Sequence, residues 1–276
     1  MSNQALQGGD GERFAFGANW YRFLSVLNDE RIEQAKCSLC KMLHVESLSG
    51  KTFLDVGSGS GLFSLAARSL GATVHSFDYD PLSVACTVEL KRRYFPGDGW
   101  IIESGSVLNP EYLAKLGRFD VVYSWGVLHH TGSMWEAVEN ILPLVKDGGK
   151  LFLAIYNKQP LMSGYWTFVK RYYNRVGPVT KWFLNYAYFL AFSLAHFSLD
   201  VLQGKNPLDR YQGKGARGMT LYYDVVDWIG GWPFEVAKPE EIFRFVSERG
   251  FQLEDLVTCG GRHGCNEFVF RADTFG

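Results

Sequence analysis

Three glycines stand at every second position between a strand-like run and a helix-like run of the sequence. They are Gly57, Gly59 and Gly61, with Asp55 two positions before the first of them and Asp78 twenty-one positions after it. A glycine turn at a strand end lets the backbone approach a ligand closely, and the start of the next helix offers free N–H groups. These residue types at this spacing predict a site for a nucleoside-containing ligand.

The glycine spacing distinguishes between the candidate ligands. A dinucleotide fingerprint needs its third glycine three positions after the second, and Leu62 occupies that place here. Asp55 would repel a pyrophosphate, but its carboxylate can anchor the ammonium group of S-adenosylmethionine (SAM), directly or through water. Asp78 ends the next strand, where an acid can accept both ribose hydroxyls. The residues therefore favour SAM over NAD.

Two adjacent histidines follow the fourth predicted strand in the motif "GVLHHTG". Open α/β sheets bind ligands at the carboxyl ends of their strands, so His129 and His130 are expected near the cofactor. Imidazole titrates near neutral pH, which suits a general base that deprotonates an oxygen nucleophile. The alternative is that a histidine only shapes the loop. We favour that alternative for His129, and His130 is the better candidate for the base.

Other polar and aromatic residues are candidates for the acceptor site. Tyr156 and Asn157 follow the fifth strand, and the connector Leu221–Glu241 is dense in Tyr, Asp, Trp and Gly. Such loop residues either bind a polyhydroxylated substrate or cap helices and pack a lid. The remaining acceptor-site candidates are Asp224, Asp227, Trp228 and Glu235 in the connector and His263, Asn266 and Glu267 between the last strands. Near the N-terminus, Asn19 and Trp20 are candidates for the cofactor site, which this part of the chain can close by folding back over the cofactor; the alternative for Trp20 is packing in the core.

These residues need a framework, and from Thr52 onward strands alternate with helices. This alternation predicts a doubly wound α/β fold with a parallel sheet covered on both faces. The last two strands are joined by so short a link that they must be antiparallel. The expected parts are an N-terminal helical segment (1–48), a cofactor-binding core (49–157), a helical cap inserted after the fifth strand (158–220), and a C-terminal part of the core with the final hairpin (221–276).

Composition restricts the functional class. The chain has 276 residues and a formal net charge of −1, which gives no electrostatic footprint for nucleic acid. Five cysteines, an odd number, fit a reducing compartment, and the first residues contain no apolar signal segment, so cytoplasm is the expected location. Zinc ligation by the Cys37–Cys40 pair or by the Cys259–Cys265 cluster is disfavoured, and no metal is expected.

The cap contains an eighteen-residue segment without formal charge, Trp182–Leu199, and basic residues precede it. A membrane span in the middle of the domain would disrupt the sheet, although the length is near the threshold. A buried lid helix or homodimer contact is favoured, and contact with a membrane surface or a lipid substrate stays open because of the basic residues Lys170, Arg171, Arg175 and Lys181.

The motifs together resemble the class I SAM-dependent methyltransferases, in particular the small-molecule branch that includes quinone-biosynthesis methylases. The resemblance covers 49–157 and 239–272 and is carried by "LDVGSGSG", "FDYDP", "GSVLN", "FDVVYSWGVLHHTG" and "DGGKLFLAIYN". It implies a seven-stranded sheet with the last strand reversed. It also implies cofactor contacts from Asp55, Gly57, Gly59 and Gly61 to the methionine part, Asp78 to the ribose, Ser106 and Val107 to the adenine, and Ser124 and Trp125 along the cleft. Ser58 and Tyr79, beside these residues, are further cofactor-binding candidates.

The expected function is therefore methyl transfer from SAM to a small-molecule or glycan-like acceptor at oxygen, with S-adenosylhomocysteine as product. The acceptor itself is not identified by the sequence. The alternatives are a non-catalytic SAM-binding sensor and, less favoured because of the glycine spacing, an NAD-dependent oxidoreductase.

Overall fold

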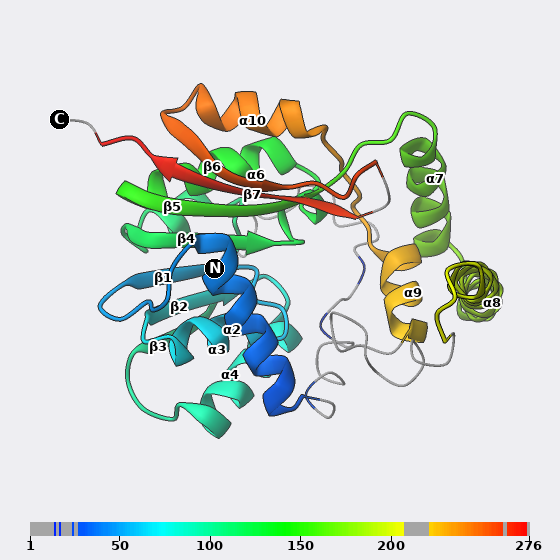
Figure 1. Ribbon diagram of the computed structural model, residues 1–276, viewed down its shortest axis with the longest axis horizontal. Coiled ribbons are helices and arrows are strands. Elements are labelled where there is room, and N and C mark those ends of the chain that lie inside the picture. The colour runs from blue at the N-terminus through cyan, green and yellow to red at the C-terminus, as the bar shows by residue number, and fades with distance from the viewer. Residues whose placement is uncertain are drawn as a thin grey trace, which may run out of the picture.

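A single seven-stranded sheet runs through the centre of the molecule in the order β3-β2-β1-β4-β5-β7-β6 (Figure 1). The structure is a computed structural model that describes residues 27–206, 221–261 and 264–274, together with Phe14, Gly17 and Leu24. Strands β1 to β5 pair in parallel, and β7 is antiparallel to β5 and β6, which confirms the predicted sheet. The strands are β1 (Thr52–Val56), β2 (Thr73–Asp78), β3 (Trp100–Ser104), β4 (Phe119–Trp125), β5 (Val145–Tyr156), β6 (Phe251–Val257) and β7 (Cys265–Ala272).

Helices cover both faces of the sheet because successive side chains of a strand point to opposite faces. In β1, Phe53 packs in a buried cluster with α2, α3 and α4, whereas its neighbour Leu54 belongs to the cluster of α5, α6 and α10. Both side chains are fully buried. The covering helices are α2 (Asp29–Leu43), α3 (Leu62–Ser69), α4 (Pro81–Tyr94), α5 (Pro110–Leu113), α6 (Met134–Ile141) and α10 (Pro239–Ser247).

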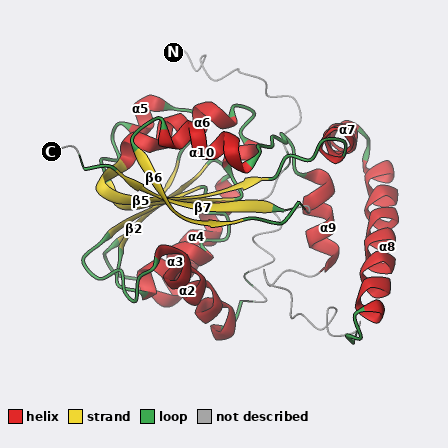
Figure 2. Cartoon of the chain, turned by 45° about the horizontal axis from the view of Figure 1, so that its top comes forward, coloured by secondary structure: helices red, strands yellow, loops and turns green. Residues whose placement is uncertain are grey.

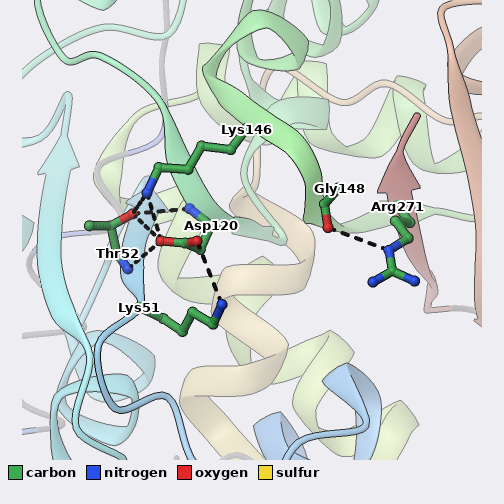
Figure 3. Close-up of polar contacts among 6 residues, drawn as sticks. All are labelled: Lys51, Thr52, Asp120, Lys146, Gly148 and Arg271. Carbon is green, nitrogen blue, oxygen red and sulfur yellow. Dashed lines mark hydrogen bonds and ion pairs between the residues drawn. The ribbon is translucent and has the colours of Figure 1, made fainter. Parts of the chain in front are cut away.

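A polar cluster joins the amino ends of β1, β4 and β5 (Figure 3). Asp120 Oδ2 accepts hydrogen bonds from the backbone nitrogen of Thr52 at 2.9 Å, its hydroxyl at 2.7 Å, and Lys146 Nζ at 2.8 Å. Burial raises the pKa of Asp120, but the bonds from Lys146 and Thr52 outweigh it and lower the pKa to about 2. Nearby, Arg271 donates to the carbonyl of Gly148. The cluster stabilises the sheet at the end opposite the glycine turn.

Three more helices form the cap beyond the carboxyl end of β5 (Figures 1 and 2). Their shared apolar cluster buries Trp166 and Tyr173 of α7 and Ile229 of α9, while Phe192 of α8 packs against it. Tyr156, the last residue of β5, also contacts this cluster and so links cap and sheet. The helical cap after the fifth strand is thus confirmed. Its helices are α7 (Met162–Arg175), α8 (Pro178–Leu202) and α9 (Leu221–Gly230).

The structure differs from the sequence interpretation in two places. The first half of the connector 221–241 is helix α9, whose apolar residues Val225 and Ile229 are buried. The glycine pair in "KDGG" predicts a turn before the fifth strand, but the strand already begins at Val145, because Val145 pairs with Phe119 before the register shifts. The four part boundaries stay predictions. Across the stretches that the structure describes, no helix combines the length and apolar character that a bilayer span requires.

Candidate functional site

The loop between β1 and α3 carries the three glycines, and each has a positive φ. The angles are 78° for Gly57, 54° for Gly59 and 78° for Gly61, a backbone conformation that L side chains rarely adopt. A Cβ atom on Gly57 would also collide with the side chain of Val127 in the loop that follows β4. Glycine is therefore required here both by conformation and by the close approach of two loops.

Asp78, the last residue of β2, fixes the glycine turn against the second strand. One carboxylate oxygen accepts the backbone N–H of Gly59 at 2.9 Å, and the other accepts that of Asp80 at 2.8 Å. The backbone nitrogens of Gly57 and Ser58 reach the carbonyl of Phe77 at 2.9 and 3.1 Å. A carboxylate is thus held at the carboxyl edge of two adjacent strands, where sheets of this kind bind nucleosides.

Asp55 lies buried at the end of β1, with 3% of its surface exposed. It accepts a hydrogen bond from the Ser64 hydroxyl of α3, which lies 2.7 Å from the Ser76 hydroxyl of β2. Burial raises the pKa of Asp55 to about 7, with the Ser64 bond opposing the shift and the charge of Asp78 adding to it. The carboxyl groups of Asp55 and Asp78 make the electrostatic potential at this end of the sheet negative, which fits a ligand that carries an ammonium and a sulfonium group. Ser64 and Ser76 were not among the predicted site residues, because single serines in a helix and a strand form no recognisable motif.

The other residues assigned to the cofactor spread along the same edge of the sheet. Ser124 donates to the carbonyl of Val56 at 3.2 Å, and Trp125 Nε1 donates to Glu267 Oε1 at 2.8 Å. The Ser58 hydroxyl lies 3.0 Å from that of Thr87. After β3, Ser106 Oγ accepts the N–H of Leu108, and the Val107 side chain packs in the core. Tyr79, directly after β2, is exposed. Their direct cofactor contacts stay predictions.

His129 and His130 end the short helix η1 (Leu128–His130), directly after Val127, and an aromatic group surrounds them. The ring centroid of Tyr156 lies 3.9 Å from that of His129 and 5.4 Å from that of His130. Tyr156 in turn packs against Trp228 at 5.4 Å and Phe234 at 5.5 Å. The structure thus brings the two histidines together with the predicted substrate residues Tyr156 and Trp228.

The segment after α9 orients the histidines. His130 Nδ1 lies 2.6 Å from the carbonyl oxygen of Pro233. Because a carbonyl only accepts, Nδ1 carries the proton and the lone pair of the neutral ring lies on Nε2. The backbone nitrogen of Glu235 donates to the carbonyl of His129 at 2.9 Å, and the Glu235 side chain accepts the N–H of Met134 at 3.0 Å. Half-burial raises the pKa of Glu235, against the opposing bonds from Met134 and Gly132.

Asn157 and Asn266 lie beside this group and bind each other. Asn266 Nδ2 donates to Asn157 Oδ1 at 3.1 Å, and Asn266 Oδ1 accepts the N–H of Cys259 at 3.1 Å. Asn266 is buried. Both amides therefore hold the ends of β5 and β7 together, and a substrate contact from either stays a prediction.

Several predicted residues lie farther away or outside the described part of the chain. Asp224 and Asp227 lie on α9, on the cap side of the site. Asn19, Trp20 and His263 fall outside the described residues. Near the N-terminus, Gly17 donates its N–H to Asp80 at 2.9 Å, and Phe14 donates to the carbonyl of Trp232 at 3.1 Å. Gly17 therefore contacts the loop after β2, and Phe14 contacts the cap side.

Lys170 of α7, one of the four basic residues that precede the uncharged segment, is a buried cation. It is fully buried and donates to the carbonyl of Trp228. Its Nζ lies 4.5 Å from the ring centroid of Trp228 and 4.8 Å from that of Phe234. Burial lowers the pKa of Lys170 to about 7, against the charge of Asp227. The aromatic residues that surround Lys170 in the sequence, such as Trp166 and Tyr173, were the available sign that its side chain could be buried.

Among the residues with described positions, no three His, Cys, Asp or Glu side chains are arranged to hold a metal ion. Cys37 and Cys40 lie in α2 as free thiols.

A family model described as a methyltransferase domain matches residues 30–203. A ubiquinone biosynthesis O-methyltransferase of Pseudomonas paraeruginosa is 33% identical over 116 residues, which cover 41% of this chain and 47% of the relative. A tRNA U34 carboxymethyltransferase of Edwardsiella ictaluri is 36% identical over 115 residues, covering 40% and 33%. The matches thus span half or less of these relatives.

Solved structures share the fold at low sequence identity. A magnesium protoporphyrin IX methyltransferase from Synechocystis with bound S-adenosylhomocysteine has a TM-score of 0.52 and 15% identity, and the alignment covers 93% of this chain and 94% of the other. An O-methyltransferase family protein from Burkholderia thailandensis has a TM-score of 0.53 and 12% identity, with 90% and 59% covered. At these identities the likeness concerns the fold.

Proposed function

The chain belongs to the methyltransferase domain family, and we propose that it transfers a methyl group from SAM to an oxygen of a small-molecule acceptor. Family membership confirms the resemblance to class I methyltransferases and SAM as the cofactor of that family. The observation that carries the proposal is the contact between the glycine turn at Gly57 and Val127, two residues before His129. It sets the predicted cofactor site directly beside the aromatic and imidazole group.

The bound cofactor would supply a methyl group on a sulfonium, with Asp55 and Asp78 providing negative charge. The group held there would provide an electrophilic methyl carbon to the acceptor oxygen and would keep the electron pair of its carbon–sulfur bond on sulfur. In our proposal Nε2 of His130 takes the proton of the acceptor hydroxyl, because the Pro233 carbonyl holds the proton on Nδ1. The rings of Tyr156, Trp228 and Phe234 would exclude water and align the acceptor.

The apolar character of this surrounding supports a small organic acceptor. The wall of the site contributed by the cap is aromatic, and the chain has a formal net charge of −1, which does not favour a polyanionic acceptor. One group of relatives carries the name of a tRNA-modifying enzyme, so bulk tRNA belongs among the tested acceptors.

The test measures conversion of SAM to S-adenosylhomocysteine by the purified full chain. Methyl-labelled SAM is offered with separate pools of catechols and other hydroxylated small molecules, of amines, and of bulk tRNA. We expect label in the hydroxylated pool, as a methyl ether. Label only in amines or in tRNA would refute the oxygen or the small-molecule part, and SAM binding without turnover on any pool would favour the sensor.

With an acceptor found, His130→Gln should lower kcat by about 10²–10⁴-fold, the usual contribution of a positioned base. The affinity for SAM should change little, and the residual rate should rise with pH as the acceptor ionises by itself. His44→Gln is the control, since His44 is an exposed residue at the end of α2, paired with Asp255. A His130 variant with the rate and pH profile of the control would refute the assignment.

A further inference from the structure

Helix α8 carries an apolar stripe on the side that faces away from the cap core. Its exposed apolar residues follow each other at intervals of four, three and four positions, and this pattern occurs twice. Leu190 and Leu194 in its middle each expose 59% of their surface. We call this set the outer stripe, and its members are Val179, Phe183, Tyr186, Leu190, Leu194, Phe197 and Val201.

The outer stripe is straight and long. An eleven-residue repeat advances three helical turns almost in phase with the α-helix, so the stripe stays on one side. From residue 179 to 201 it extends about 33 Å at 1.5 Å per residue. The opposite side of α8 packs on the cap cluster through Leu184, Tyr188 and Phe192. Figure 2 shows α8 as the outermost element at its end of the molecule. An apolar surface of this size on a soluble chain marks an interaction site.

The charges around the outer stripe have one sign. Residues 158–206 contain six Lys and Arg but a single acid, Asp200, although the whole chain has a formal net charge of −1. Asp200 is buried, as is Lys170. The charged side chains at the surface of α7, α8 and the residues just after them are therefore all basic. Arg171 Cζ lies 5.0 Å from the ring centroid of Trp232, and Lys181 Nζ lies 5.4 Å from that of Tyr173, whereas Arg175 and Lys205 flank the two ends of α8.

This charge distribution disfavours a second copy of the chain as the occupant. Two α8 helices packed antiparallel about Leu190 would bring Arg175 near Lys205 of the second copy. Like charges at such distances oppose association.

We propose that the outer stripe binds the surface of an anionic lipid bilayer, with α8 lying in the plane of the headgroups. The apolar side chains would enter the boundary between headgroups and acyl chains, and Arg175 and Lys205 at the two ends of α8 would meet lipid phosphates. Trp182 and Tyr186 add amphipathic rings of the kind that favour this interface. The inference does not depend on the reaction, since it concerns the side of the cap turned away from the site.

Sedimentation of the full chain with vesicles tests the proposal. We expect binding to vesicles that contain phosphatidylglycerol, weaker binding to pure phosphatidylcholine, and release by salt. Leu190→Glu with Leu194→Glu should reduce binding at least about tenfold. The matched control is Val88→Glu, a similar change at an exposed residue of α4, which should bind like the wild type.

The second measurement does not rely on the Glu variants folding. Lipids with brominated acyl chains should quench the fluorescence of Trp182, and Trp182→Phe should remove most of that quenching. Light scattering without lipid determines the oligomeric state. Failure of the wild type to bind anionic vesicles, equal losses in the stripe and control variants, or a dimer that the double Glu variant converts to monomers would each overturn the proposal.

Discussion

The buried carboxyl group of Asp55 makes the stability of the protein depend on pH in an unusual direction. Burial raises its pKa from 3.8 to about 7 in the folded chain. Between these two values the folded state holds a proton that the unfolded state has released, so stability falls as pH rises and levels off above pH 7. From pH 5 to pH 8, the loss from this group is about 3 kcal/mol, at 1.36 kcal/mol for each pH unit up to the folded pKa.

Asp55→Asn should remove this loss, because a neutral amide has nothing to ionise and can still accept from Ser64. The assay is urea unfolding of both proteins at pH 5, 6, 7 and 8. The difference in the free energy of unfolding, variant minus wild type, should grow by about 3 kcal/mol across this range. Taking differences across pH cancels any constant cost of the substitution. Parallel profiles for the two proteins would refute the buried carboxyl as the origin.

The same group predicts a proton signal on cofactor binding. If the ammonium of SAM lies near Asp55, its charge lowers the pKa of Asp55, so binding at pH 6 should release a proton. Calorimetry in buffers of different ionisation enthalpy measures that release. Binding without proton release would place the ammonium elsewhere.

The other predictions concern the edge of the sheet, its opposite end and the cap. Asp78→Ala should weaken SAM binding at least about tenfold in calorimetry, since it removes both the predicted ribose contact and the bond to Gly59; an unchanged affinity would contradict the ribose placement. Asp120→Ala should lower the free energy of unfolding at pH 7 by about 1–3 kcal/mol. Because the folded pKa of Asp120 is about 2, this contribution is present above pH 4 and lost as pH falls toward 2, so an effect that persists at pH 2 would refute it. Lys170→Met should raise the free energy of unfolding, relative to wild type, by about 2–3 kcal/mol more at pH 6 than at pH 9. Between its folded pKa of about 7 and the ordinary value of 10.5, only the unfolded chain holds the lysine proton, so the cost of burying Lys170 grows as pH falls from 9 to 7. Urea unfolding at both pH values measures this, and equal differences would refute it.

The cofactor side of the molecule could be predicted from the sequence because it depends on local patterns. Glycine turns, strand periodicity and an acid at a strand end are set by backbone geometry within a few residues. The same reasoning gave the antiparallel last strand from the length of one link. These features are confirmed by the sheet, by the φ angles of Gly57, Gly59 and Gly61, and by the family match.

The cap side could not be predicted to the same depth. From the sequence, Lys170 could not be distinguished from the other basic residues before Trp182. Sequence spacing alone does not show that Trp228 and Phe234, some sixty residues later, pack over it. Residues 221–230 have too many polar and aromatic residues to stand out as a helix until α7 and α8 supply a surface for Val225 and Ile229. Contacts between distant segments determine both outcomes.

The chain leaves and re-enters the core at neighbouring points. Asn157 pairs with Ala237 in an isolated bridge, and the backbone of Ala237 bonds to Tyr156 and Lys158 on either side at 3.0 Å. The segment between Asn157 and Ala237 therefore begins and ends at adjacent points of the core. We expect that a short turn can replace this segment without moving any strand. Because the two ends are adjacent, we expect that a different cap can be inserted as one segment while the strands stay in place, and that such an exchange would change the acceptor preference.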